Sequence, residues 1–113
     1  MIDRGKFKEN FVYLDKEVVI EIIDIFLDEY EGRLIKIQNN ISVQDFAGLK
    51  FDAHSLKGVI ANFMDPPTIE LSRSLDEKAK HEDSTGLQEL FNDLKSATES
   101  LVVELHDLKN DFT

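Results

Sequence analysis

The chain has 113 residues, a net charge of −10 and no cysteine. Its length fits one domain over residues 1–113, and its acidity argues against nucleic acid or an anionic membrane as partner, because both require basic surfaces. The missing cysteines exclude disulfides and thiolate chemistry and fit a cytoplasmic location, and no apolar run approaches the ~20 residues that span a bilayer.

Two helices are predicted in the first third of the chain. Phe7 and Phe11 lie one turn apart and predict a short helix over residues 3–12. A long helix is predicted over residues 15–40, with Asp15 as its cap. The apolar residues of the long helix fall on one face, as expected for a helix against a core: Val19, Ile22, Ile23, Phe26, Tyr30, Leu34 and Ile37.

Two more helices are predicted around the only prolines of the chain. Ser42, followed by Asp45 three residues later, resembles a capping pair and predicts a third helix that ends near residue 64. The Asp-Pro-Pro sequence at 65–67 ends that helix, because the residue before a proline disfavours helical geometry. Proline is favoured at a first helical position, so a fourth helix is predicted over residues 67–80.

The last helix carries the clearest periodicity in the chain. Residues 81–85 are predicted to form a loop, with Ser84 as a candidate cap, and the helix is predicted over residues 85–109. Short connections place successive helices antiparallel. The predicted fold is therefore all-α, an up-down antiparallel four-helix bundle with a short extra N-terminal helix.

His54 is predicted to face solvent. The core face of the third helix carries Leu49, Leu56, Ile60 and Phe63, and His54 lies about 140° from the centre of that face at 100° per residue. The residues that share its strip are small or basic: Ala47, Lys50, Lys57, Gly58 and Ala61. No residue of this helix places a carboxylate there.

An ordinary surface histidine is the simplest interpretation of His54. Gly58 argues against it, because glycine inside a helix costs about 1 kcal/mol relative to alanine. Ala47 and Ala61 also have short side chains, so little projects from this strip. Long charged residues would serve stability better there, so the strip favours close approach by another protein.

The sequence Ala53-His54-Ser55-Leu56-Lys57-Gly58, followed by Asn62-Phe63, resembles the histidine phosphotransfer (HPt) domains of multistep phosphorelays. The resemblance implies that His54 accepts a phosphoryl group from an aspartyl phosphate of a receiver domain and passes it to a second receiver. It implies receiver domains and a hybrid sensor histidine kinase as partners, and a monomeric state. The family commonly has glycine where this chain has Met64, which leaves the shape of the following turn open.

Within that resemblance, four further residues receive roles. Lys57, at i+3 from His54, would stabilise the phosphoryl group by charge. Gly58 would leave room for the phosphoryl group and for the receiver. Lys50 and Ala61 would support the site, the first by its charge and the second by its small size.

The site is expected to need no cofactor or metal ion of its own. The magnesium that the transfer requires is expected on the receiver, because no carboxylate cluster is recognised beside His54. The chain has no glycine-rich phosphate loop or nucleotide-binding box, so we expect a phosphoryl carrier, not a kinase. The other two histidines, His81 and His106, are predicted to be solvated.

A receiver would also need an apolar docking patch. Val18, Ile22 and Ile25 on the long helix, with Phe51 on the third, are the candidates, and we call them the docking patch. They could equally widen the core stripe or pack under the N-terminal helix.

Two alternatives to a relay carrier remain. A sensor-kinase dimerisation domain is disfavoured, because Ser55 and Gly58 occupy positions where that family usually has an acidic residue and a proline. A helical interaction bundle that has lost the relay, a pseudo-HPt, is the other hypothesis. The sequence does not identify the kinase, the regulator or whether this chain is part of a larger hybrid kinase.

Overall fold

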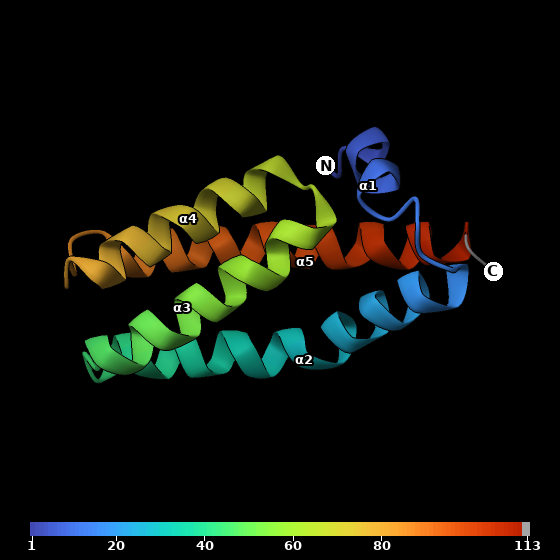
Figure 1. Cartoon of the computed structure of the whole chain (residues 1–113). Coiled ribbons are helices and arrows are strands. Elements are labelled where there is room, and N and C mark those ends of the chain that lie inside the picture. Colours follow the sequence, from blue (N-terminus) through green and yellow to red (C-terminus); the bar gives the residue numbers. More distant parts are fainter. Residues whose placement is uncertain (112–113) are drawn as a thin grey trace.

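The computed structural model describes residues 1–111, and within that range it contains helices and no strand. The predicted all-α fold is confirmed (Figure 1). The elements are α1 Arg4–Asn10, α2 Lys16–Ser42, α3 Phe46–Ile60, the short 3-10 helix η1 Ala61–Phe63, α4 Pro66–Lys80 and α5 Leu87–Asn110.

The four long helices run up and down, as predicted. Figure 1 shows α3 crossing obliquely between α2 and α4, with α5 alongside. The pair α3 and α4 is packed most extensively, whereas α2 and α5 touch less. The short α1 lies across the end of the bundle where α3 passes into α4, and the backbone N–H of Asp3 donates to the carbonyl of Met64 over 2.6 Å.

The core forms from the apolar faces that the periodicity predicts. Phe26 of α2 contacts Phe63 of η1 with ring centroids 4.9 Å apart, which joins the first and middle helices of the bundle. Phe7 in α1 and Phe11 directly after it are both buried, and their ring centroids are 4.8 Å apart. Burial of each side chain of this size contributes about 1.5–3 kcal/mol to the stability of the fold, so this core fixes the position of α3.

Two predicted boundaries between α2 and α3 were wrong. Ser42 is the last residue of α2 and not a cap, because the helix continues past residue 40 into a tight turn at Gln44, whose φ is 55°. Asp45 alone caps α3, and its Oδ1 accepts from the backbone N–H of Gly48 over 2.9 Å. At the other end, α3 stops at Ile60, since the next three residues tighten into η1.

Boundaries of α1, α4 and α5 also shift, by at most two residues. Helix α1 is shorter than residues 3–12, because Asp3 is its cap and the chain leaves the helix at Phe11. Asp65 caps α4, which starts at Pro66. Helix α5 starts at Leu87, after Gly86 in the left-handed conformation with φ 64°, so Ser84 is not its cap.

The turn between η1 and α4 keeps a left-handed residue although glycine is absent there. Met64 has φ 55° and ψ 40°, a conformation that favours glycine and costs a residue with a side chain about 1 kcal/mol. Its partly buried side chain packs against the core. Packing therefore holds the turn whose shape the sequence left open.

Candidate functional site

His54 lies in the middle of α3 with 69% of its side chain exposed. Its neighbours Ala53 and Leu56 are buried in the core, which fixes the rotation of the helix. The prediction that His54 faces solvent is confirmed. The exposed imidazole of His54 is therefore accessible to another protein.

A buried carboxylate lies beneath His54. Asp76 comes from α4, its side chain is 1% exposed, and its Oδ1 is 3.5 Å from Nδ1 of His54. Its other oxygen, Oδ2, accepts from Nζ of Lys57 over 2.9 Å and lies 3.4 Å from Nζ of Lys80. One imidazole and two ammonium groups thus surround one carboxylate at the α3–α4 contact, and we call these four residues the Asp76 cluster.

The two lysines keep Asp76 ionised. Burial raises the pKa of this carboxyl, but the hydrogen bonds from Lys57 and Lys80 outweigh that effect and hold its pKa below the ordinary value. A buried charge is tolerated only when such partners compensate its lost hydration. The charge on Asp76 is therefore a fixed property of the site at neutral pH.

The expectation of a strip without a carboxylate was wrong for the assembled surface. It holds for α3 itself, but packing of α4 brings Asp76 against His54. Lys57, expected to stabilise the phosphoryl group, is paired with Asp76 in the structure. Analysis of one helical face misses such a group, because a neighbouring helix supplies it.

One pattern in the sequence could have revealed Asp76. Thr68, Ser72, Asp76 and Lys80 follow one another at four-residue spacing along α4, and the first three are buried. A polar row of this kind at the edge of an apolar stripe indicates a polar contact between helices. Without its partner helix, it does not indicate which residue it meets.

The remaining predicted site residues keep the strip open. Gly58 and Ala61 are exposed, and a Cβ at Gly58 would meet no atom within 4 Å. Lys50 is not one of the partners of Asp76, and its Nζ lies 3.7 Å from Oε1 of Glu82. Lys50 therefore pairs with the loop after α4.

The residues of the docking patch differ in how far they are buried. Val18, Ile25 and Phe51 are exposed, whereas Ile22 is half-buried and packs on the core. A groove of about 480 Å³ runs between α2 and α3 beside Phe51, and it is lined by Asp28, Glu29, Gly32, Arg33, Lys36, Phe51, Asp52 and Ser55. Apolar and charged groups thus meet on the α2 side of His54.

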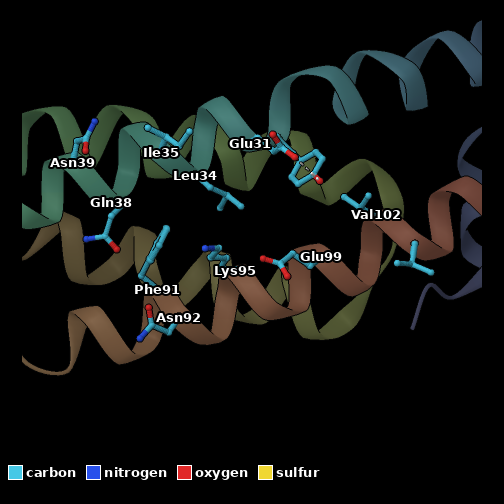
Figure 2. A pocket seen from close by; sticks show the side chains of 12 residues that line it. Glu31, Leu34, Ile35, Gln38, Asn39, Phe91, Asn92, Lys95, Glu99 and Val102 are labelled. Atoms are coloured by element: carbon cyan, nitrogen blue, oxygen red, sulfur yellow. Dashed lines mark hydrogen bonds between the residues drawn. The ribbon is translucent and has the colours of Figure 1, made fainter.

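A second hollow, of about 780 Å³, lies between α2 and α5. Figure 2 shows Leu34 and Phe91 directed into it from the two helices, with Lys95 and Glu99 further along α5. No residue of α3 or α4 lines it, so it is separate from the Asp76 cluster.

Within residues 1–111, no group of three or more histidine, aspartate or glutamate side chains could hold a metal ion. In the same range no helix is both long and apolar enough to cross a membrane.

A family model described as the Hpt domain matches residues 21–109, which include the Asp76 cluster. The chain belongs to the Hpt family. No curated protein and no solved structure matches it. Hpt domains act in phosphorelay signalling as phosphoryl carriers, not kinases, and interact with receiver domains and kinases of two-component systems. The resemblance seen around His54 is confirmed at the level of the family.

Proposed function

We propose that His54 of this Hpt domain accepts a phosphoryl group from the aspartyl phosphate of one receiver domain and passes it to another. The observation that carries the proposal is an exposed imidazole on an otherwise low helical strip, next to ammonium groups. Near neutral pH a histidine is substantially unprotonated and can act as a nucleophile without a strong base.

The surroundings of His54 supply what phosphoryl transfer needs from a carrier. Such transfer depends on positioning and on stabilisation of charge. Lys57, one turn from His54, is a cation beside it, and its partly exposed side chain can turn towards a phosphoryl oxygen. We expect magnesium to come with the receiver, which holds the phosphoryl group before transfer.

The surface around His54 supports docking of a receiver domain. Gly58 and Ala61 are exposed and low on one side, and Phe51 is exposed on the other. We propose that Val18, Ile25 and Phe51 of the docking patch contact the receiver. The half-buried Ile22 would support them from below.

The first experiment is transfer from a phosphorylated, magnesium-loaded receiver domain to the wild-type chain and to His54→Gln. We expect acid-labile, base-stable phosphate on the wild type and none on the variant. His81→Gln is the matched control, because His81 is also exposed and also contacts a carboxylate, Glu77 at 3.6 Å. That control should label like the wild type.

Labelling of His54→Gln at the wild-type level would exclude His54 as the acceptor. No labelling of the folded wild type by a panel of receivers would favour the pseudo-HPt alternative, a helical interaction bundle without transfer. A hybrid sensor kinase as the source of phosphate, a monomeric state and a cytoplasmic location stay predictions.

A further inference from the structure

The hollow between α2 and α5 has no part in the relay site. It holds about 780 Å³ and is lined by residues of these two helices. His54 lies where α3 contacts α4, and neither of those helices lines the hollow. No residue of the docking patch lines it either. A partner bound in this hollow would therefore leave the histidine and the proposed receiver surface free.

The hollow has a buried apolar floor and exposed apolar side chains beside it. Leu34, Phe91 and Val102 are at most 8% exposed, whereas Ile35 is 60% exposed and Val103 is 64% exposed. Covering exposed aliphatic side chains next to such a floor removes apolar surface from water. A face with both projecting and sunken apolar parts can also fit a copy of itself, because each copy supplies what the other lacks.

Two opposite charges stand on the α5 side of the hollow. Lys95 and Glu99 are both exposed and one helical turn apart, and Figure 2 shows them following one another along α5. Within residues 1–111 neither side chain forms a hydrogen bond or an ion pair. The third charge on this face, Glu31, accepts a hydrogen bond from the hydroxyl of Tyr30 over 3.2 Å. A complementary surface must therefore bring a basic and an acidic group in the reverse order to Lys95 and Glu99.

A second copy of α5 supplies this reverse order when the two helices pack antiparallel about Ala97. A two-fold axis at Ala97 brings together residues that lie equally far from it on its two sides. Lys95 then faces Glu99 of the second copy, and Glu99 faces Lys95 of that copy. Phe91 faces Val103 of the second copy in the same way. Apolar groups thus meet on both sides of the paired charges, and the small side chain of Ala97 lets the helices approach.

We propose that the hollow between α2 and α5 is the contact face of a weak homodimer, in which the two α5 helices pack antiparallel about Ala97. The net charge of −10 on each chain opposes association, whereas the two pairs of Lys95 with Glu99 favour it locally. The dimer is therefore expected at high concentration, and the monomeric state that the family resemblance implies is expected in dilute solution.

The proposed dimer keeps both relay sites accessible. Because the hollow is formed by α2 and α5, the contact of α3 with α4 stays at the surface of each copy. A dimer then presents two copies of His54, so two receivers could bind to it at the same time. The rate of transfer per histidine should be the same in monomer and dimer.

The first test is sedimentation equilibrium of the full chain from about 10 µM to about 1 mM, in about 0.15 M salt, which screens the net charge over ~8 Å. We expect a change from monomer to dimer with a dissociation constant of about 100 µM. NMR spectra over the same range should show shifts at Ile35, Lys95 and Val103 and none at His54. A chain that is still monomeric at about 1 mM would overturn the proposal and leave the hollow to a helix of another protein.

Charge reversal tests the pairing itself. Lys95→Glu and Glu99→Lys each place like charges opposite one another, so each should raise the dissociation constant at least about tenfold. The double variant restores opposite charges and should return to within about threefold of the wild type. Glu99→Lys is informative because it also reduces the net negative charge, so general repulsion cannot explain a weaker dimer. Lys8→Glu changes the charge equally on α1 and should leave the dimer nearly unchanged.

Each result decides for or against the proposal. A dimer that neither single variant weakens would lie on another face, and a double variant without recovery would contradict the antiparallel pairing about Ala97. Both changed residues are exposed, and thermal unfolding of dilute samples checks that the fold is kept. The proposal is independent of the relay function: a chain that dimerises and accepts no phosphate would overturn only the relay function, and a monomeric chain that accepts phosphate would overturn only the dimer.

Discussion

Two buried carboxylates, Asp65 at the cap of α4 and Asp76 within α4, have different kinds of partner. Asp65 precedes the helix at the end covered by α1, and its Oδ2 accepts from the hydroxyl of Thr68 over 2.7 Å and from the Thr68 backbone N–H over 3.4 Å. Asp76, three turns later, is bound by the flexible side chains of Lys57 and Lys80 and faces an exposed histidine. Both are almost fully buried.

The difference lies in what else the partners could bind. The partners of Asp65 on Thr68 belong to the first turn of the same helix, so breaking them breaks the start of α4. The partners of Asp76 are ends of long side chains, and these can turn to an incoming anion without moving the backbone. We therefore assign Asp65 to stability and Asp76 to the relay site, and the following predictions test that division.

The largest expected effect is on docking. Gly58→Lys places a long side chain on the strip beside His54, where a Cβ would meet no atom of another element of residues 1–111 within 4 Å. We expect transfer from a receiver to fall by about a hundredfold, equivalent to a few kcal/mol of lost docking. Thermal unfolding should stay at or above the wild-type temperature, because lysine is the better helix former.

Val103→Lys is the control for the added charge. It changes an exposed position of α5, on the hollow between α2 and α5. Equal loss of transfer in the two lysine variants would contradict a docking surface centred on Gly58.

Asp65→Ala should lower stability and leave transfer alone. It removes the cap of α4 and leaves the buried Thr68 without its side-chain acceptor, so the free energy of unfolding should fall by about 2 kcal/mol. Urea denaturation measures this loss. The transfer rate per folded molecule should match the wild type, and a tenfold drop would place Asp65 in the relay site.

Lys57→Ala should slow transfer and change stability less than Asp65→Ala does. It removes the cation proposed to bind a phosphoryl oxygen through a charge-assisted hydrogen bond worth roughly 1.5 kcal/mol, so transfer should slow about tenfold. Its effect on unfolding should be smaller than that of Asp65→Ala, because Lys80 still pairs with Asp76. Lys80→Ala, one turn beyond Asp76 and more exposed, should slow transfer less, and a larger effect would exchange the roles of the two lysines.

Acid should remove the contribution of Asp76. Its pKa is below the ordinary 3.8, since hydrogen bonds from Lys57 and Lys80 outweigh burial. A lowered pKa in the folded state stabilises the fold above the ordinary value, and that contribution disappears as pH falls through the folded value. The stability difference between wild type and Asp76→Asn should therefore be largest at pH 7 and shrink by about pH 3 in urea titrations. A difference that stays constant would show that the charge of Asp76 contributes nothing to folding.

Features that lie within one helix could be predicted from the sequence, whereas features that depend on turn geometry or on a second helix could not. The five helices, their antiparallel order and the exposure of His54 followed from periodicity, which is a property of each helix alone. The exact ends did not: Ser42 continues α2, and Gly86 precedes α5, because turn geometry decided those positions. Asp76 was missed for a related reason, since its partner His54 comes from another helix.

The smallest expected effects concern the glycines, and they test why Gly58 is there. Gly48 has an internal reason, because a Cβ would lie 2.6 Å from Oδ2 of Asp45. Gly58 and Gly32 have none, since a Cβ at either would meet nothing within 4 Å. Gly58→Ala and Gly32→Ala should each stabilise the chain by roughly 0.5–1 kcal/mol, measured by urea denaturation.

Transfer should separate the two alanine variants. Gly58→Ala should slow it severalfold, because its methyl group stands where a receiver approaches His54, and Gly32→Ala on α2 should leave it unchanged. The reverse result would move the point of closest approach from α3 to the groove beside Phe51. A stability gain in Gly58→Ala combined with slower transfer would show that Gly58 serves the approach of a partner and not the stability of α3, and it would locate that partner's contact at one residue.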